Sequence, residues 1–271
     1  MREVVLPTGW KPYSLAAAAG GALWMTLVEP GGLARLDTLE LHPTAGRPMQ
    51  AAAALGELWY TTDADTLGRV HPPLTVDLPA GSAPYGVDIG LDGSVWFTAP
   101  GRDRLGRRAP DGTVTYVDLP EGSYAAMLAV TADGAVWAAL NRAGALARWD
   151  GELRIIPAPT APVGVAADGD GVWFADIAGG AVGFADPSGA VRRFAFDEAG
   201  GVPCRPHAVA ADPDGGCWAT LWGSGELARV SPDGAIERTA LPGSEPHGLI
   251  VADGEVWVAM ESGSLVSVAR T

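Results

Sequence analysis

Two glutamates flank a histidine near the end of the sequence. Glu245 precedes His247 by two residues, and Glu261 follows beyond an Asp-Gly pair at residues 253–254. Carboxylate oxygens are hard ligands that suit magnesium or calcium, and magnesium takes only one or two of them because it keeps several waters. An imidazole has an unperturbed pKa near neutral pH and can act as a base. Together, these side chains could bind a divalent cation beside a general base.

A tight hairpin would bring the three side chains together. An Asp-Gly pair between apolar runs is a strong hairpin signal. A two-residue turn at this pair places His247 opposite Met260 and within one residue of Glu261. Glu245 lies on the same entering segment as His247. The pattern therefore predicts that Glu245, His247 and Glu261 meet at one rim of one sheet.

A repeated tryptophan indicates the elements that must hold this rim. Seven of the ten tryptophans follow one another at intervals of 35 to 45 residues, each in a short apolar stretch after a Gly-containing turn. A unit of about 40 residues with four short strands cannot bury both faces of its sheet alone, so the units must stack radially. The sequence thus predicts an all-β fold, a seven-bladed β-propeller with four-stranded antiparallel blades. The repeated residues are Trp24, Trp59, Trp96, Trp137, Trp173, Trp218 and Trp257.

The two ends of the chain suit a closed ring. Most repeats finish with an extended segment near Leu-Pro, whereas the last repeat stops after three strands and the chain opens with EVVLP at residues 3–7. We therefore expect the segment at about 3–7 to be the outermost strand of the last blade, which leaves only short protected edges. The continuous repeat shows no boundary, so residues 1–271 are expected to form a single domain.

The first strand of each blade marks a candidate binding surface. In a propeller this strand lines the central channel, so the residue after its leading proline, or the equivalent residue, is expected at the channel mouth. Polar rings occupy three consecutive blades at His207, His247 and Tyr13, and Tyr85 is expected to form a wall of the mouth. One arc of the mouth is therefore equipped for chemistry. The seven expected mouth residues are Tyr13, Met49, Tyr85, Ala126, Val163, His207 and His247.

Trp222 is expected beside this arc. A two-residue turn at Asp214-Gly215 places Trp222 opposite His207. Trp222 is additional to the repeated seven, so it is interpreted as an exposed aromatic platform for an apolar ligand.

Charge and composition limit the partners. The formal net charge is −14 and the sequence pI is about 4.6, which disfavours a nucleic acid or an anionic membrane as partner. The N-terminus resembles no signal peptide and no apolar run approaches a membrane span, so a cytoplasmic protein is expected, and a closed propeller can work as a monomer. Cys204 and Cys217 are expected to be small buried hydrophobes, with a disulfide as the alternative.

Three segments near the C-terminus carry a family resemblance. The motifs SAPYG, PVG and a repeated D-G-x-x-W-F-T pattern span the chain, but propellers of this group share them widely. More discriminating are RPHAV at 205–209, SEPHGL at 244–249 and AMES at 259–262. Through these segments the chain resembles the virginiamycin B lyase family, also called streptogramin B lyases. The resemblance implies that His207 contacts substrate, that Glu245 and Glu261 bind magnesium, and that His247 is the proton acceptor.

The same resemblance implies an activity. Members of the family are magnesium-dependent carbon–oxygen lyases that confer antibiotic resistance by opening a small cyclic depsipeptide lactone without adding water. The ring opens by β-elimination at a threonine whose side chain forms the ester. This chain departs from the family where blades often carry Glu three residues after the tryptophan, because only Asp176 is acidic there and Leu221 lies near His207. Two alternatives stay open: a metal-dependent lactonase or other hydrolase, and a non-catalytic ligand-binding propeller.

Overall fold

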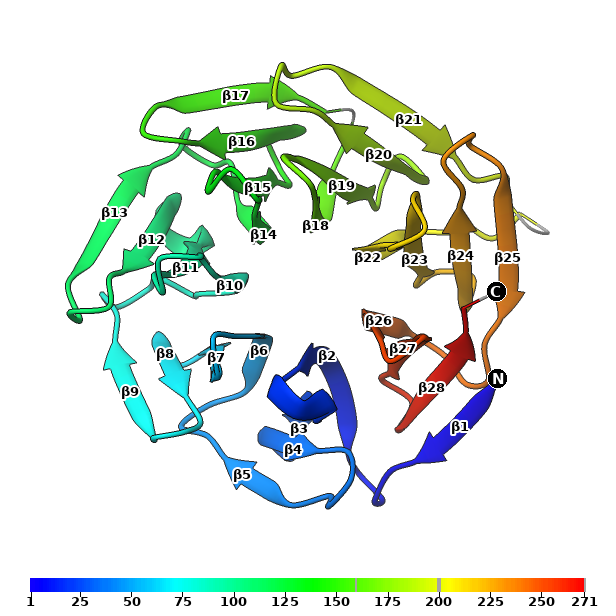
Figure 1. The fold of residues 1–271 in the computed structure, drawn as a ribbon, viewed down its shortest axis with the longest axis horizontal. Coiled ribbons are helices and arrows are strands. Elements are labelled where there is room, and N and C mark those ends of the chain that lie inside the picture. The colour runs from blue at the N-terminus through cyan, green and yellow to red at the C-terminus, as the bar shows by residue number, and fades with distance from the viewer. Residues whose placement is uncertain (159, 199–200, 271) are drawn as a thin grey trace.

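Seven four-stranded antiparallel sheets form a ring in the computed structural model, which describes residues 1–158, 160–198 and 201–270 (Figure 1). The prediction of seven four-stranded antiparallel blades is confirmed. Within the described residues, helix is limited to two 3-10 turns, η1 (Ala19–Gly21) and η2 (Pro100–Arg102).

Each blade runs from an inner strand at the channel to an outer strand at the rim (Figure 1). The inner strands are β2 (Lys11–Ala17), β6 (Pro48–Ala54), β10 (Val87–Ile89), β14 (Ala125–Val130), β18 (Pro162–Asp168), β22 (Pro206–Ala211) and β26 (Pro246–Ala252). The second strands are β3 (Leu23–Glu29), β7 (Glu57–Thr62), β11 (Val95–Ala99), β15 (Val136–Leu140), β19 (Gly171–Asp176), β23 (Cys217–Leu221) and β27 (Glu255–Met260). The third strands are β4 (Gly32–Arg35), β8 (Thr66–Arg69), β12 (Arg104–Arg108), β16 (Ala145–Trp149), β20 (Ala181–Ala185), β24 (Glu226–Val230) and β28 (Ser264–Ala269). The outer strands are β5 (Leu41–Pro43), β9 (Leu74–Asp77), β13 (Val114–Asp118), β17 (Leu153–Pro157), β21 (Val191–Ala195), β25 (Ile236–Ala240) and β1 (Arg2–Val5).

The N-terminal strand closes the ring, as predicted. β1 is the outer strand of the last blade and pairs with β28, from Arg2 opposite Ser267 to Val5 opposite Ser264 (Figure 1). Its bounds differ from the predicted 3–7, because pairing within the strand ends at Val5. The Leu6 amide still donates to the Gly263 carbonyl at 3.0 Å, but Pro7 has no amide hydrogen to continue the ladder.

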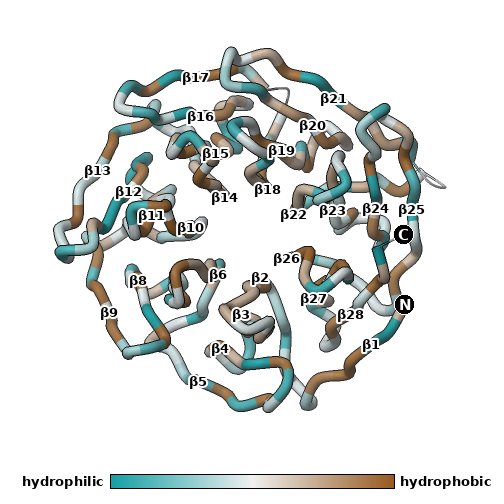
Figure 2. The backbone as a smooth tube through the Cα atoms, viewed as in Figure 1, coloured by the Kyte–Doolittle hydropathy of each residue, from teal (hydrophilic) through white to brown (hydrophobic). Residues whose placement is uncertain are grey.

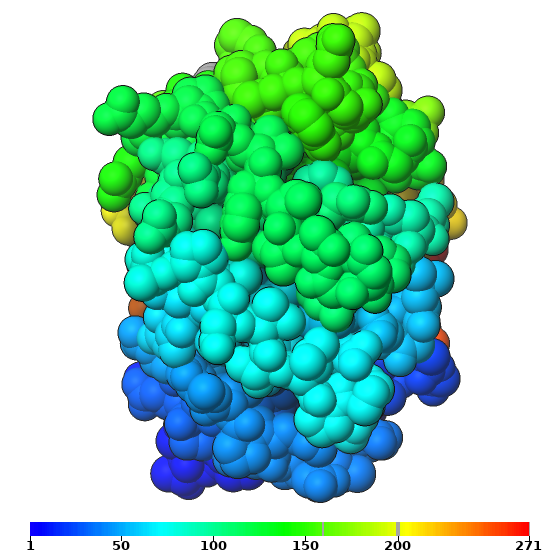
Figure 3. Space-filling model, turned by 90° about the vertical axis from the view of Figure 1, so that its left-hand side faces the viewer, coloured from blue at the N-terminus to red at the C-terminus, as the bar shows by residue number. Residues whose placement is uncertain are grey.

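The repeated tryptophans all lie on the second strands, and none is more than 8% exposed. Their side chains belong to apolar clusters that cross from one blade to the next; one such cluster contains Trp137, Trp173 and Cys217. Seen edge-on, consecutive blades lie against one another as successive bands from blue to green (Figure 3). Hydrophilic and hydrophobic residues are mixed along the outer strands (Figure 2). The core therefore lies between the blades, which explains the period of the tryptophans.

A β-bulge recurs at the channel end of the inner strands. The register between the first and second strands shifts near the start of the inner strand in six of the seven blades. In the sixth blade, for example, the shift lies between the Pro206–Leu221 pair and the Val209–Ala219 pair. A bulge places one extra residue on the inner strand and changes the direction of its side chain. Six of the seven expected mouth residues, including His207 and His247, fall inside these bulges. The exception is Tyr85, which precedes β10 in the blade without a register shift.

Glycine on the third strand makes room for an aromatic ring on the second. Phe97 is paired with Gly106, and a Cβ atom on Gly106 would overlap the buried Phe97 ring. The fourth blade pairs two alanines, Ala138 and Ala147, at the same register. The size of the side chain on the second strand is therefore complementary to that of the residue opposite it on the third strand. The same aromatic–glycine pairs occur as Tyr60–Gly68 and Phe174–Gly183.

Gly106→Ala is expected to destabilise the protein by about 2–3 kcal/mol, because the methyl group overpacks a site where Phe97 is fully buried. Phe97→Ala should leave space for that methyl group, as the Ala138–Ala147 pair shows. Urea unfolding of both single variants and the double variant measures the coupling. If the two single effects simply add, the steric explanation is wrong.

Both cysteines, Cys204 and Cys217, are buried and free, so the expectation of small buried hydrophobes is confirmed and the disulfide alternative is not. Among the described residues, no helix has the length and apolar character needed to cross a membrane.

Candidate active site

Four aromatic side chains meet at the channel mouth. His207 and His247 lie with ring centroids 4.6 Å apart and nearly perpendicular, and the Tyr13 ring lies 4.4 Å from that of His247. The Tyr13 and Tyr85 hydroxyls are hydrogen-bonded at 2.6 Å. The structure thus brings together all four polar rings that the sequence analysis placed at the mouth. Tyr85 is a hydrogen-bond partner of Tyr13 as well as a wall.

A threonine hydroxyl connects the two histidine blades. Thr220 accepts a hydrogen bond from the Ala208 amide at 3.0 Å and donates one to the His247 carbonyl at 2.8 Å. It therefore fixes the backbone next to His207 relative to the backbone of His247. The sequence analysis did not single out Thr220, although it is the residue two positions after a repeated tryptophan. The same position forms equivalent links between other blades through Thr26, Thr61 and Thr98.

His247 is paired with a carboxylate. Its Nε2 atom lies 2.7 Å from Oε2 of Glu261, a distance typical of a charge-assisted hydrogen bond. Its Nδ1 atom is fully buried and has no partner among the described residues. Nε2 is therefore the ring nitrogen that can reach a ligand.

Burial keeps these rings neutral. Burial is the main cause that lowers the pKa of His207 to about 3, and the nearby His247 adds to the shift. Burial also lowers the pKa of His247, partly offset by Glu261 and Glu245. The pKa values of Tyr13 and Tyr85 are raised, mainly by burial. At neutral pH the mouth therefore offers neutral imidazoles and protonated hydroxyls.

The buried His207 should make the protein less stable in acid. In the unfolded chain this histidine takes up a proton near pH 6.5, whereas in the folded protein it does so only near pH 3. At pH 8 His207 is neutral in both the folded and the unfolded protein, so it does not change the free energy of unfolding. Below pH 6.5 the unfolded chain takes up the proton more readily, and at pH 5 this lowers the free energy of unfolding by ~2 kcal/mol. Denaturant unfolding of the wild type and His207→Gln at pH 8 and pH 5 should show this difference. An equal pH-dependent loss in both proteins would contradict it.

Glu245 and Glu261 form the acidic part of the site. The Glu261 amide donates to the Glu245 carbonyl at 3.1 Å, so the two residues lie side by side. Glu245 has a left-handed backbone conformation with φ of 57° and is exposed, and no described residue hydrogen-bonds to its carboxylate. Oxygen donors from two carboxylates fit magnesium, which completes its shell with water or substrate. The described residues contain no group of three or more His, Cys, Asp or Glu side chains placed to hold a metal, so any ion here would rely on this pair.

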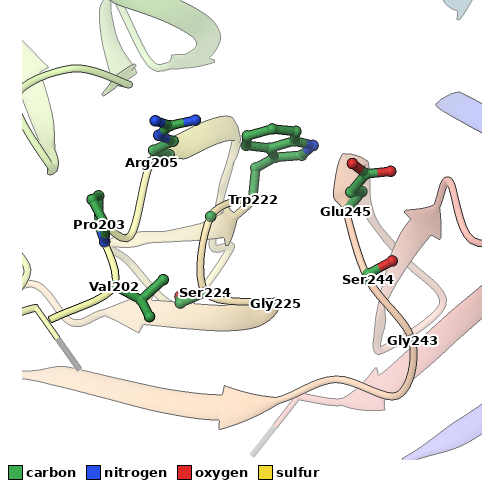
Figure 4. A pocket seen from close by; sticks show the side chains of 10 residues that line it. Val202, Pro203, Arg205, Trp222, Ser224, Gly225, Gly243, Ser244 and Glu245 are labelled. Atoms are coloured by element: carbon green, nitrogen blue, oxygen red, sulfur yellow. The ribbon is translucent and has the colours of Figure 1, made fainter. Parts of the chain in front are cut away.

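A hollow beside the rings could hold a ligand. Its volume is about 460 Å³, and Arg205, Trp222 and Glu245 line it together with Val202 and Pro203 (Figure 4). A neighbouring hollow of about 520 Å³ shares Arg205 and Trp222. The Trp222 ring lies 6.3 Å from that of His247, and its buried Nε1 atom has no partner among the described residues. Trp222 therefore lines the hollow, but it is half-buried and not exposed as predicted.

The predicted strand pairing is wrong by one residue at the mouth. The turn at Asp253 and Gly254 has the expected positive φ values of 50° and 77°, but the bulge places Pro246, not His247, opposite Met260. His247 therefore reaches Glu261 from inside the bulge.

The second predicted pairing, of Trp222 with His207, is also wrong. The turn is longer than two residues, because Asp212 and Gly216 are joined by a backbone hydrogen bond of 3.0 Å. This turn shifts the pairing by one residue, and the bulge between Pro206 and Val209 shifts it by one more, so Leu221 is paired with Pro206. The Trp222 amide donates to the carbonyl of Arg205 at 3.0 Å.

Asp176 keeps the acidic residue of the family pattern, whereas Leu221 departs from it, and neither side chain is exposed at the mouth. Asp176 is fully buried and accepts hydrogen bonds from Thr160 and the Ala161 amide, among others. Leu221 is also fully buried and belongs to the core between blades. These positions therefore serve packing and loop structure in this chain.

Comparison with known proteins gives the family. The profile of the virginiamycin B lyase family matches residues 1–268. A curated protein of Nocardia farcinica, named virginiamycin B lyase, is 39% identical over an alignment of 269 positions that covers 95% of each chain. The crystal structure of virginiamycin B lyase from Staphylococcus aureus has a TM-score of 0.93 at 28% identity, covering 100% of this chain and 99% of that one. A catalytically inactive histidine-to-alanine variant of the S. aureus enzyme, solved with quinupristin, has a TM-score of 0.90 at 27% identity, with coverage of 100% and 99%. The resemblance seen in the sequence is thus confirmed, and the chain belongs to the virginiamycin B lyase family, a family of carbon–oxygen lyases.

Proposed function

We propose that this protein opens a streptogramin B-type cyclic depsipeptide lactone by β-elimination at the ester-linked threonine. Family membership and the quinupristin complex of the S. aureus relative support this substrate class. The observation that carries the proposal is the His247–Glu261 contact of 2.7 Å beside a neutral His207, at the edge of a hollow. This arrangement offers a base, a group that stabilises its protonated form, and a neutral hydrogen-bonding partner.

His247 would act as the general base through Nε2. This atom takes the α-proton of the threonine, the electron pair of that C–H bond forms the double bond to the β-carbon, and the ester oxygen leaves with its electron pair as part of a carboxylate. Glu261 then stabilises the imidazolium at 2.7 Å. To accept a proton at Nε2, the resting ring carries its own proton on Nδ1. A cation bound to Oε1 of Glu261 would withdraw electron density from the carboxylate and weaken its hydrogen bond to an Nε2 proton, which would favour that form.

The remaining aromatic side chains would hold the substrate. Burial keeps His207 neutral, so it can hydrogen-bond to a carbonyl or hydroxyl group of the substrate without adding a charge. Trp222 offers an indole face, while its buried Nε1 atom has no partner among the described residues, and Tyr13 is held by its hydrogen bond to Tyr85. Such a mixture of rings and a few placed polar groups is typical of small-molecule sites.

Glu245 and Glu261 would hold magnesium. The pair supplies the two oxygen ligands that this ion accepts, and the Oε1 atom of Glu261 remains available while Oε2 contacts His247. When bound, the ion would polarise the carbonyl next to the α-carbon and stabilise enolate-like negative charge. Glu261 would thus connect the ion and the base.

The mass of the product tests the reaction. The protein is incubated with magnesium and quinupristin, and the product is analysed by mass spectrometry. Elimination gives an opened ring of unchanged mass with a dehydrated residue. A gain of one water would establish a lactonase instead, and an unreacted ring under conditions where it binds would favour a binding protein. A chelator in a parallel reaction tests the requirement for the ion.

A further inference from the structure

In each blade one rim residue comes two positions before the expected mouth residue. Four members of this set have left-handed backbone conformations, with φ between 47° and 57°: Ala83, Tyr124, Arg205 and Glu245. Glu245 therefore shares its backbone conformation with three of its six counterparts in the other blades. In chain order the seven rim residues are Lys11, Arg47, Ala83, Tyr124, Ala161, Arg205 and Glu245.

Cations flank Glu245 in this ring of rim residues. Arg205 occupies the rim of the preceding blade, and Lys11 occupies that of the following blade, because the ring closes through β1. Two of the three basic rim residues already have carboxylate partners: Lys11 binds Glu29 at 2.9 Å, and Arg47 binds Asp63 at 2.8 Å.

Arg205 is different. Within the described part of the chain it forms no ion pair, and its guanidinium carbon lies 5.7 Å from the centre of the Trp222 ring. Stacking on an indole orients the planar guanidinium and leaves its edge donors unused. The charge of Arg205 is therefore available for an anion.

The position of Arg205 relates this charge to the reaction. Arg205 lines both hollows beside the mouth, and the Trp222 ring lies close to both its guanidinium, at 5.7 Å, and the ring of His247, at 6.3 Å. Figure 4 shows the guanidinium on one side of the indole and the Glu245 carboxylate on the other. The site thus has a pair of carboxylates at one end and an unpaired cation at the other.

Elimination creates an anion that such a cation would bind. The substrate ester is neutral, but when the bond between the β-carbon and oxygen breaks, the electron pair leaves with the carboxyl group and gives it a full negative charge. A guanidinium matches a carboxylate with two parallel hydrogen bonds. We propose that Arg205 binds this departing carboxylate and stabilises it as it forms, an inference that rests on the proposed function.

Binding of the linear product tests the proposal without turnover. The probes are the linear acid of quinupristin, containing the dehydrated residue, and the methyl ester of that acid. Isothermal titration is carried out with EDTA, so that no divalent ion can bind the carboxylate. The wild type is expected to bind the acid at least about tenfold more tightly than the ester. Arg205→Gln should lose this preference, and Arg205→Lys should keep part of it. Arg47→Gln, at the same rim position in the second blade, is the matched control and should behave as the wild type.

Kinetics provide the second measurement. Arg205→Gln is expected to lower kcat for lactone opening about tenfold, with a smaller change in KM, because the charge appears only after the ring begins to open. A wild type that binds acid and ester equally, or an Arg205→Gln variant that keeps the preference, would overturn the assignment. If the wild type prefers the acid through Arg205 but does not open the lactone, the proposed function fails and the anion site stands.

Discussion

His247→Ala is expected to reduce kcat for lactone opening about 10³-fold, because general bases commonly contribute 10²- to 10⁴-fold. The variant loses the whole imidazole ring, including Nε2, which would accept the α-proton. In the wild type Nε2 alone can have this role, because Nδ1 is fully buried. Glu261 and the aromatic walls remain, so substrate affinity should change much less. Steady-state kinetics with quinupristin and a mass-based assay give both parameters.

His42→Ala is a suitable control for this variant. His42 lies on β5, an outer strand, and packs against Trp24 at 5.1 Å between centroids, away from the mouth rings. Its removal should leave kcat within a factor of two. Circular dichroism and thermal unfolding show whether both variants are folded. A folded His247→Ala protein with wild-type turnover would rule out His247 as the base.

Glu261→Gln is expected to weaken magnesium binding by at least about 100-fold and to reduce turnover at limiting magnesium by a similar factor. The amide keeps the size of the side chain but removes the negative charge and one hard oxygen, which leaves Glu245 as the remaining carboxylate of the pair. The substitution also replaces the carboxylate that would stabilise the imidazolium at 2.7 Å. Titration of magnesium by calorimetry measures the affinity independently of activity.

Two further variants separate the roles of Glu261. Glu245→Gln should also weaken magnesium binding, but at saturating magnesium its kcat should approach the wild-type value because the His247–Glu261 contact remains. Glu255 is the first residue of β27, whereas Glu261 directly follows the last one, Met260, so Glu255→Gln should have no effect on magnesium binding. Unaltered magnesium affinity in Glu261→Gln would show that the ion, if required, binds elsewhere.

The repeated sequence pattern was sufficient to predict the propeller architecture. The repeated tryptophan lies on the second strand of every blade because each blade must bury one large side chain against its neighbour. The same repeat aligned the residues at the channel mouth, so Tyr13, His207 and His247 could be placed together before any coordinates. A propeller is well suited to such inference, since one period determines all seven units.

Single-residue irregularities limited the prediction of the site. Hairpin counting assumes an unbroken ladder, but each bulge adds one residue to the inner strand, so Met260 pairs with Pro246. The repeat also does not predict which side chains of non-adjacent blades touch, as the hydrogen bond between Tyr13 of the first blade and Tyr85 of the third illustrates. Arg205 was overlooked because its significance depends on which basic residues already have partners, and a repeat contains no such information.

The matched pairs on the second and third strands bear on how propellers diversify. In a duplicated blade, the side chain on the second strand and the residue opposite it on the third strand must change together, as in Phe97–Gly106 and Ala138–Ala147. Recombination that joins blades between these two strands would set a phenylalanine against an alanine and produce an unstable hybrid. Crossovers in the loops that lead to the outer strands keep each pair intact. Viable chimeras of this ring should therefore inherit their second and third strands as one unit from one parent.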